Sequence, residues 1–129
     1  NAQDEEAPAP ASVSSTDERI KNDIITVRHD ESYIFIKFGD IITVKTSGKK
    51  CIMKTVSGSY STDYSLSDLE GKSCGRLLRV HRNSLINPSR IKKVEKYFSG
   101  SYVVIMENNE IVEMSRRLSS VFRNNYLKN

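Results

Sequence analysis

The sequence predicts a mainly β fold: an elongated antiparallel β-sheet domain with a short internal helix and a C-terminal helix. Short segments rich in β-branched and aromatic side chains follow one another from residue 24 onward. Gly, Ser, Asn and Asp separate these segments at close intervals, which is typical of hairpin turns. Apolar residues at helical spacing are confined to one short internal segment and to the C-terminal end.

The first half of the predicted fold contains four strands and the internal helix. The strands cover residues 24–29, 33–38, 41–46 and 51–56, with a Gly39-Asp40 turn and a loop at 47–50 between the last three. Residues 57–65, "SGSYSTDYS", are predicted to form a loop. Ser65 can cap a short helix that carries Leu66 and Leu69 and ends at Gly71.

The second half begins with "RLLRVHRNSLIN", residues 76–87, which mixes basic and core-forming side chains. Strands are predicted at 91–98 and 101–107 around a Ser-Gly turn, and Asn108-Asn109 turns the chain into a strand at 110–114. Ser115 can cap the last helix. Its apolar residues recur at helical spacing and predict one stripe against the sheet: Leu118, Val121, Phe122 and Tyr126.

The chain divides into an acidic tail and one domain. Residues 1–23 are rich in Pro, Ala and Ser and are expected to form a flexible linker or tail, whereas residues 24–129 form the domain. Because linkers join domains and the first residue is not Met, we expect a fragment of a longer protein with a domain upstream. No signal peptide or apolar membrane span is visible, so a cytoplasmic location is expected.

Charge is distributed unevenly along the chain. Residues 1–23 have a net charge of −4, whereas the remainder carries 18 bases and 10 acids, a net +8. Residues 76–96 alone contain seven bases against one acid. Such clustering indicates a polyanion-binding surface. The alternative is a solvated basic face that only keeps the protein in solution.

Enzymatic chemistry is not indicated. Cys51, Cys74, His29 and His81 lack the paired spacings of a zinc site, and two cysteines are too few for a disulfide scaffold. Neither cysteine lies in a recognisable nucleophile context, and no glycine-rich loop suited to phosphate is present. We therefore expect a non-enzymatic protein that needs no cofactor or metal.

Basic residues instead gather at predicted loops. Lys49 and Lys50 lie at a hairpin tip, and Arg79, His81 and Arg82 lie at a strand end. Arg116 and Arg117 lie at a helix N-terminus, where the helix dipole disfavours cations. A DNA phosphate or a guanine edge would explain that placement. The competing explanation is that both arginines lie over the sheet with their charged ends in water.

Several sequence motifs, some of them in these basic loops, resemble those of a known family. "RVHRNSLINPSRI" (79–91) resembles the signature of the LytTR DNA-binding domain. It matches at Arg79, His81, Arg82, Leu85, Ile86, Asn87 and Ile91. "FGDIITV" (38–44), "SLSDLE" (65–70) and "VEMSRRL" (112–118) resemble further segments of that family, in the same order. Asn83-Ser84, Lys45-Thr46 and Lys49-Lys50 depart from the family pattern.

The resemblance implies sequence-specific binding of double-stranded DNA by the output domain of a bacterial response regulator. Its loops would enter successive major grooves of direct repeats. A receiver or sensor domain would precede it in the full-length protein, and a second copy of the chain is a possible partner on DNA. It points to contacts by Lys49 and Lys50, by Arg82 and by Arg116. No membrane contact is expected, because the polar side of the last helix is rich in Asn and Ser rather than Lys.

These considerations assign a role to each candidate residue. Arg82 and Arg116 are predicted to read guanine edges, and phosphates are assigned to Lys49, Lys50, Lys92, Lys93 and Arg117. Arg79 is also counted among the predicted DNA-binding residues. His81 and Asn83 could contact DNA or hydrogen-bond the loop, and Asn87 before Pro88 is interpreted as a turn residue.

Two other functions compete with duplex recognition. An RNA-binding β module would stack bases on exposed aromatic side chains, for which the candidates are Tyr33, Phe35, Tyr97 and Tyr102. Their spacing suits core positions equally well. A protein-interaction module with a basic face is the other alternative. Preference for duplex over single strand separates the first from a DNA-binding domain, and failure to bind any nucleic acid would favour the second.

Overall fold

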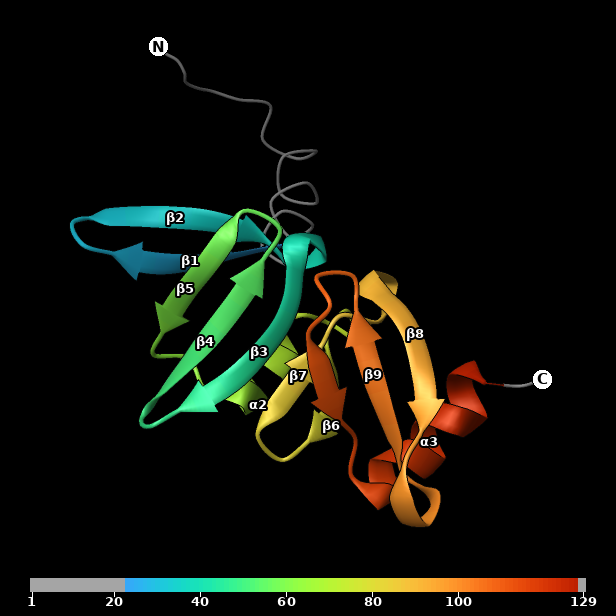
Figure 1. Ribbon diagram of the computed structural model, residues 1–129. Coiled ribbons are helices and arrows are strands. Elements are labelled where there is room, and N and C mark those ends of the chain that lie inside the picture. The colour runs from blue at the N-terminus through green and yellow to red at the C-terminus, as the bar shows by residue number, and fades with distance from the viewer. Residues whose placement is uncertain (1–22, 128–129) are drawn as a thin grey trace, which may run out of the picture.

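The computed structural model describes residues 23–127 and shows a mainly β protein with two α-helices in that range (Figure 1). The strands are β1 (Ile24–His29), β2 (Ser32–Lys37), β3 (Ile41–Ser47), β4 (Lys50–Thr55), β5 (Gly58–Thr62), β6 (Leu78–His81), β7 (Ser84–Ile86), β8 (Ile91–Lys96), β9 (Tyr102–Met106) and β10 (Ile111–Glu113). The helices are α2 (Leu66–Lys72) and α3 (Arg116–Tyr126), with short 3-10 turns η1 (Phe38–Asp40), η2 (Pro88–Arg90) and η3 (Phe98–Gly100). The predicted tail falls almost wholly on residues 1–22, outside the described residues.

The strands form three antiparallel sheets rather than one continuous sheet. The largest has the order β5-β4-β3-β7-β6, the second is β10-β9-β8, and β1 and β2 form a separate hairpin. In Figure 1 the hairpin lies at one end of the molecule, the large sheet in the middle, and the β8–β10 sheet with α3 at the other end. The predicted mainly β, antiparallel architecture is therefore confirmed.

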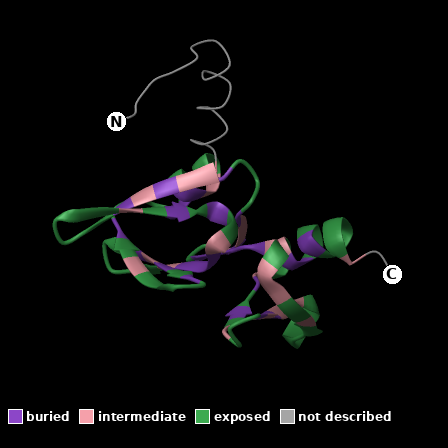
Figure 2. Ribbon diagram, turned by 90° about the horizontal axis from the view of Figure 1, so that it is seen from above, coloured by how far each residue is buried: buried purple, intermediate pink, exposed green. Residues whose placement is uncertain are grey.

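Two hydrophobic clusters hold these layers together. One joins the β1–β2 hairpin and α2 to the large sheet, and the other joins that sheet to β9, β10 and α3. Adjacent residues of β7 enter different clusters: Leu85 packs in the first and Ile86 in the second. Because successive side chains of a strand point to opposite faces, the large sheet is buried on both sides near β7. In Figure 2 most buried segments lie in the interior of the molecule, whereas the projecting loops are exposed.

The internal helix has the predicted start. The Ser65 side chain accepts a hydrogen bond from the Asp68 N–H (3.0 Å), and the Asp68 carboxylate accepts one from the Ser65 N–H (3.2 Å). This reciprocal capping box satisfies two backbone donors at the helix start. The helix extends past the predicted end at Gly71 to Lys72, and Leu66 and Leu69 are buried as expected.

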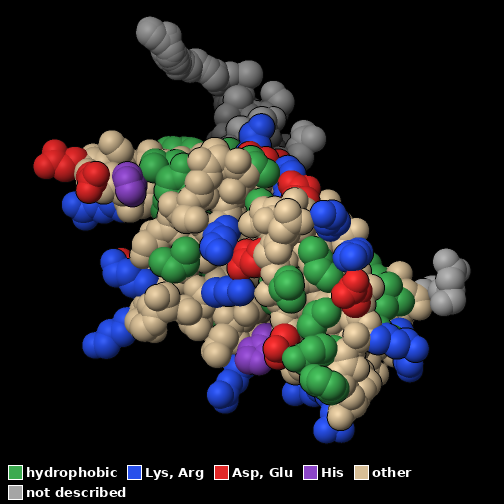
Figure 3. Space-filling view, in the orientation of Figure 1, with side chains coloured by type: hydrophobic (Ala, Val, Ile, Leu, Met, Phe, Trp, Pro, Cys, Tyr) green, Lys and Arg blue, Asp and Glu red, His purple; other side chains and the backbone are tan. Residues whose placement is uncertain are grey.

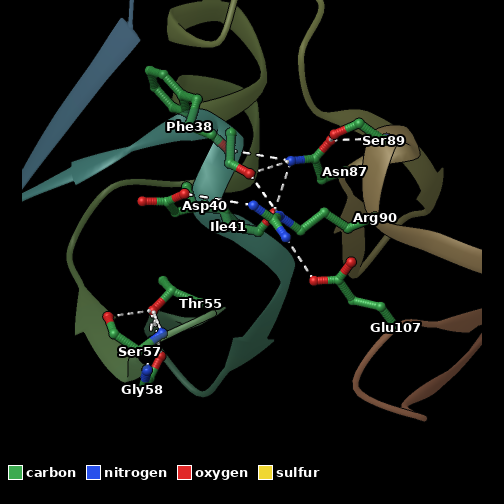
Figure 4. Close-up of polar contacts among 11 residues, drawn as sticks. Phe38, Asp40, Ile41, Thr55, Ser57, Gly58, Asn87, Ser89, Arg90 and Glu107 are labelled. Atoms are coloured by element: carbon green, nitrogen blue, oxygen red, sulfur yellow. Dashed lines mark hydrogen bonds and ion pairs between the residues drawn. The ribbon is translucent and has the colours of Figure 1, made fainter.

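The predicted loop at 57–65 is wrong over residues 58–62, which form β5. This edge strand pairs with β4 through its backbone, and its polar side chains concealed it in the sequence. The turn between β4 and β5 is closed by Thr55, whose hydroxyl accepts the N–H groups of Ser57 (3.2 Å) and Gly58 (3.1 Å) and donates to the Gly58 carbonyl (2.8 Å) (Figure 4).

The C-terminal helix starts as predicted but faces the sheet differently. The Ser115 side chain accepts the Leu118 N–H (3.2 Å), which confirms the cap. Ser119 and Phe122 are buried, and the Ser119 hydroxyl accepts the Tyr102 N–H (3.1 Å). Val121 is 46% exposed and Tyr126 is 50% exposed, so the predicted four-residue stripe is wrong at these two positions. The small polar residue Ser119 contacts β9 instead.

Two tight turns connect strands in the second half of the domain. Residues 76–87 contain two paired strands, β6 and β7, joined by Arg82 and Asn83. The predicted Asn108-Asn109 turn is present, and Asn109 has the left-handed conformation expected of it, with a φ of 69°.

Candidate nucleic-acid interface

Three turns that carry basic residues lie along one edge of the molecule. They are the β3–β4 turn at residues 48–49, the β6–β7 turn at residues 82–83 and the start of α3 at Arg116. In Figure 1 all three lie along the lower edge, and in Figure 3 blue side chains project from that edge. The second turn is joined to the end of β3 just before the first turn, because the Thr46 N–H donates to the Asn83 carbonyl (3.1 Å).

Two adjoining hollows show which basic residues share this surface. One, of about 290 Å³, is lined by Lys49, Lys50, Arg79 and Arg82 among others. The other, of about 620 Å³, is lined by Arg79, His81, Arg82 and Arg117. Because Arg79 and Arg82 line both, the structure brings six of the predicted residues onto one continuous surface.

Arg79 is held within the protein. Its Nε donates to the His81 carbonyl (3.1 Å), and its Nη2 donates to the Arg82 carbonyl (2.9 Å). Its Nη1 lies 3.4 Å from Glu70 Oε1 at the end of α2. The guanidinium therefore fastens the β6–β7 turn to α2, and it supports the turn from which Arg82 projects.

His81 and Asn83 also serve the geometry of this turn. The Asn83 N–H donates to His81 Nδ1 (3.3 Å), so the imidazole hydrogen-bonds the loop, one of the two roles predicted for it. His81 and Asn83 both line a third hollow, of about 340 Å³, on the side of the turn nearest β10. The two residues flank Arg82 in the chain.

Four basic side chains of these loops have no hydrogen bond or ion pair within the described residues: Lys49, Arg82, Arg116 and Arg117. All four are exposed. Lys50 differs, since its Nζ lies 3.4 Å from the Asp63 carboxylate, an exposed pair that water screens strongly. Four unpaired cations thus lie on the three turns, while the other exposed cations without such a partner in the described residues, Arg28, Lys37, Lys96 and Arg123, are spread over β1, β2, β8 and α3.

Lys92 and Lys93 are not part of this surface. Both lie on β8, in the three-stranded sheet, and not on any of the three turns. They line none of the three hollows, and neither does Arg116, which nevertheless adjoins Arg117 at the start of α3. Lys92 Nζ donates to Asn109 Oδ1 (2.9 Å), and Lys93 pairs with Glu95 (3.0 Å). The structure therefore separates them from the other predicted residues.

Asn87 lies at the end of β7 opposite the β6–β7 turn. Its side-chain nitrogen donates to the carbonyls of Phe38 (3.3 Å), Gly39 (3.2 Å) and Ile41 (2.9 Å), while its oxygen accepts from the N–H and hydroxyl of Ser89 (Figure 4). The side chain is buried and ties η1 to η2. Its interpretation as a turn residue is confirmed.

Arg90 reinforces the same junction. Its guanidinium donates to the Gly39 carbonyl (2.7 Å) and to Glu107 Oε2 (2.6 Å), and it lies 3.5 Å from Asp40 (Figure 4). Much of the basic cluster at 76–96 is therefore structural. Alternation of charge and apolar residues in the sequence could not separate such an arginine from one available to a ligand.

Glu110 joins the two larger sheets through a group of cations. Its carboxylate accepts the Thr43 hydroxyl (2.8 Å) and lies 2.9 Å from Lys45 Nζ and 3.6 Å from Lys54 Nζ, with its side chain 10% exposed. Burial alone would raise the pKa of Glu110, but the hydrogen bonds from Lys45 and Thr43 and the charges of Lys45 and Lys54 outweigh it and lower the pKa.

We expect Glu110→Gln to lower the free energy of unfolding by about 1–2 kcal/mol at pH 7, because it removes a charge-assisted hydrogen bond at a sheet junction. A carboxyl with a lowered folded pKa stabilises the fold above its ordinary pKa of 4.5 and loses that effect as the pH falls through the lower, folded value. The difference between variant and wild type should therefore shrink as the pH falls below the ordinary pKa of 4.5. Urea denaturation at several pH values measures it. An unchanged difference at acid pH would contradict the role, and Glu95→Gln, at an exposed pair, is the matched control.

Three further features of the described residues concern metal binding, membrane spanning and thiol reactivity. No group of three or more His, Cys, Asp or Glu residues there could hold a metal ion, and no helix there is long and apolar enough to cross a membrane. Cys51 is buried, and burial raises the pKa of its thiol against the opposing charge of Arg79, so the thiol stays protonated near neutral pH.

The aromatic candidates do not form one stacking surface. Tyr33 and Phe35 are exposed on β2, whereas Tyr97 lies beyond the end of β8 and Tyr102 is half-buried on β9. Their strands belong to different sheets, and in Figure 1 these sheets lie at opposite ends of the molecule. Successive bases of a single strand could not stack on all four.

The fold and this surface define a class of protein: an antiparallel β domain that presents basic side chains from two strand-connecting turns and from the first turn of a helix. The family model of the LytTr DNA-binding domain matches residues 31–126. The chain belongs to this family, and the resemblance seen in its sequence motifs is confirmed.

Two similar proteins are sensory transduction proteins. The chain is 26% identical to the sensory transduction protein LytR of Staphylococcus epidermidis over 110 residues, which are 84% of this chain and 44% of that protein. It is 32% identical to the sensory transduction protein LytT of Bacillus anthracis over 88 residues, 67% of this chain and 36% of that protein. The chain thus spans less than half the length of these relatives.

A solved structure shares the fold. A LytTr DNA-binding domain from Bacillus cereus superposes with a TM-score of 0.72 at 22% identity, covering 79% of this chain and 94% of that one.

Proposed function

We propose that this domain binds double-stranded DNA with sequence specificity as the output domain of a bacterial transcriptional regulator. The observation that carries this proposal is the contrast between paired and unpaired cations. Arg79 and Arg90 are fastened to backbone carbonyls and acids, while Lys49, Arg82, Arg116 and Arg117 project unpaired from three adjacent turns. A rigid base that carries free cations suits a polyanion of regular shape.

The free side chains divide into two roles. Arg82 and Arg116 each carry a planar fork that can donate to O6 and N7 of guanine, which discriminates by roughly 1–3 kcal/mol per good pair. Lys49, Lys50 and Arg117 neutralise phosphates, which positions the domain and makes its affinity depend on salt. Arg79, His81 and Asn83 hold the turn that aims Arg82.

The wider setting follows from the family and from the length of its members. The turns would enter successive major grooves, and direct repeats would seat a second copy. The relatives are more than twice as long as this chain's match, which leaves room for a receiver or sensor domain. Such a regulator acts in the cytoplasm, where bacterial DNA lies. Lys92 and Lys93, paired on β8, are left outside the proposed interface.

The test is selection from a randomised duplex pool by the 129-residue chain, followed by sequencing and by fluorescence anisotropy over about 50–200 mM salt. An enriched motif and a steep salt dependence are expected. Steep dependence without enrichment would leave a non-specific polyanion binder. Tighter binding to single-stranded RNA than to any duplex would favour the RNA-binding alternative, and no binding to nucleic acid would favour a protein-interaction module.

A further inference from the structure

The β1–β2 hairpin has an open edge. Among the described residues β2 pairs with β1 alone, and its other edge makes no backbone hydrogen bond. The hairpin tip projects from the body of the molecule in Figures 1 and 2. A two-stranded sheet is marginal by itself, and an open edge is a template for a further strand.

The register shows which backbone groups are open. A two-residue turn joins His29 to Ser32, so Ser32, Ile34 and Ile36 exchange hydrogen bonds with β1. The N–H and C=O groups of Tyr33, Phe35 and Lys37 therefore point away from β1. The same residues have exposed side chains, with Tyr33 66% and Phe35 71% exposed. In Figure 3 hydrophobic side chains are visible along the hairpin, behind a tip that carries charged side chains and a histidine.

This edge lacks the usual protection against pairing. β2 has no proline, and its register with β1 is regular, whereas β3, β6 and β8 each contain a register shift. Its sequence, Ser-Tyr-Ile-Phe-Ile-Lys, is rich in strand-forming residues and carries a single charge at its end. Edges that stay unpaired are generally interrupted by charges, prolines or bulges.

We propose that β2 pairs antiparallel with β2 of a second copy of this chain, with Phe35 opposite Phe35 on the two-fold axis. Tyr33 of each copy then lies opposite Lys37 of the other, so that the two ammonium groups meet aromatic rings rather than each other. Glu31, two residues before Tyr33, lies diagonal to the same lysine. The edge is thus complementary to itself in backbone pattern, aromatic contact and charge.

The pairing closes rather than propagates. A two-fold contact uses the same β2 edge of both copies, and the other strand of each hairpin, β1, packs near β5 without backbone pairing to it. Six residues on each side bury little area, so the contact is weak in solution and gains strength when two copies are held close together. The pairing requires no DNA, and its test is independent of the proposed function.

Cysteine cross-linking of the 129-residue chain tests the register. Exposed Cys74, whose φ is 53°, is first replaced as Cys74→Asn to remove background, while Cys51 is buried. Paired Cα atoms are about 5.5 Å apart, within disulfide range, so Phe35→Cys should form a covalent dimer under mild oxidation. Tyr33→Cys should not, because its counterpart lies about 14 Å away along the strand.

The expected result is cross-linking of Phe35→Cys at least about ten-fold faster than of Tyr33→Cys, and cross-linking of a mixture of Tyr33→Cys with Lys37→Cys. Equal rates for Phe35→Cys and Tyr33→Cys, or no dimer from any variant, would overturn the proposal. Sedimentation provides a second measurement. Phe35→Lys should weaken self-association, whereas Ile111→Lys, at a comparably exposed position on β10, should not. Larger polymers would contradict the closed pair.

Discussion

Arg82→Ala should lower affinity for the selected duplex roughly 5- to 150-fold, because it removes one bidentate contact to a guanine edge. Arg82 projects from the β6–β7 turn with no partner among the described residues, so its removal should leave the fold unchanged. Affinity for a scrambled duplex should fall only about two- to three-fold, the share of a single lost charge. Anisotropy titrations at one salt concentration measure both.

Arg123→Ala is the matched control, since Arg123 is an exposed arginine in the last turn of α3 rather than on the three turns. It should change neither affinity by more than about two-fold. Equal losses on selected and scrambled duplexes for Arg82→Ala would contradict a base-reading role. They would leave Arg82 as a phosphate contact.

Arg79→Ala should behave differently from Arg82→Ala. It removes two hydrogen bonds to turn carbonyls and the pair with Glu70, so it should lower both the thermal midpoint and the affinity for every duplex. The pair of neighbouring arginines thus separates a residue that supports the interface from one that touches DNA. A destabilised Arg82→Ala and an unaffected Arg79→Ala would reverse these assignments.

Asn87→Ala should lower the free energy of unfolding by about 2–4 kcal/mol, the largest stability effect expected for a polar residue in this protein. The amide donates to three carbonyls and accepts from Ser89 within a buried junction, and alanine would leave those groups without their partner. Asn87→Asp should be at least as damaging, because it puts a carboxylate against three carbonyl oxygens. Urea denaturation monitored by circular dichroism measures both.

Asn83→Ala is the control for chemistry of the same kind at an exposed turn, and it should stay within about 0.5 kcal/mol of wild type. If Asn87→Ala matched it, the junction between η1 and η2 would not depend on the amide. Because that junction supports the strands that carry the turns, Asn87→Ala should also weaken DNA binding when it is partly unfolded at the assay temperature.

Local signals in the sequence predicted much of the fold. The caps at Ser65 and Ser115 and the turn at Asn109 were each predicted from a side chain that satisfies its own nearby backbone. Such interactions span only a few residues, so the order of residues contains them.

Features that depend on distant partners were missed. β5 is a strand because β4 offers it a backbone edge, and its own side chains are polar. In α3 Ser119 is buried and its hydroxyl accepts a hydrogen bond from the backbone of β9, whereas Val121 is exposed to solvent. Neither choice follows from apolar periodicity, since each depends on what the fold places opposite.

The candidate interface shows the same division. The basic turns were predicted from clustering and from the family resemblance. Which cations are free was not, because the pairs Arg79–Glu70, Arg90–Glu107 and Lys45–Glu110 join residues from separate elements. Glu110 in particular gave no sign of its role, since the sequence placed it only as the first residue of a predicted strand after the Asn108-Asn109 turn.

We propose above all that the unpaired cations of the three turns bind DNA. The most direct measurement is the slope of log K against log salt for the wild type and two variants, one with Lys49, Arg82, Arg116 and Arg117 changed to alanine and one with Lys92 and Lys93 changed. Each lost phosphate contact reduces the slope by about 0.9. The account predicts a slope lower by roughly 2–4 for the turn variant and an unchanged slope for the β8 variant. An unchanged slope for the turn variant, or a larger loss from the β8 variant, would contradict it.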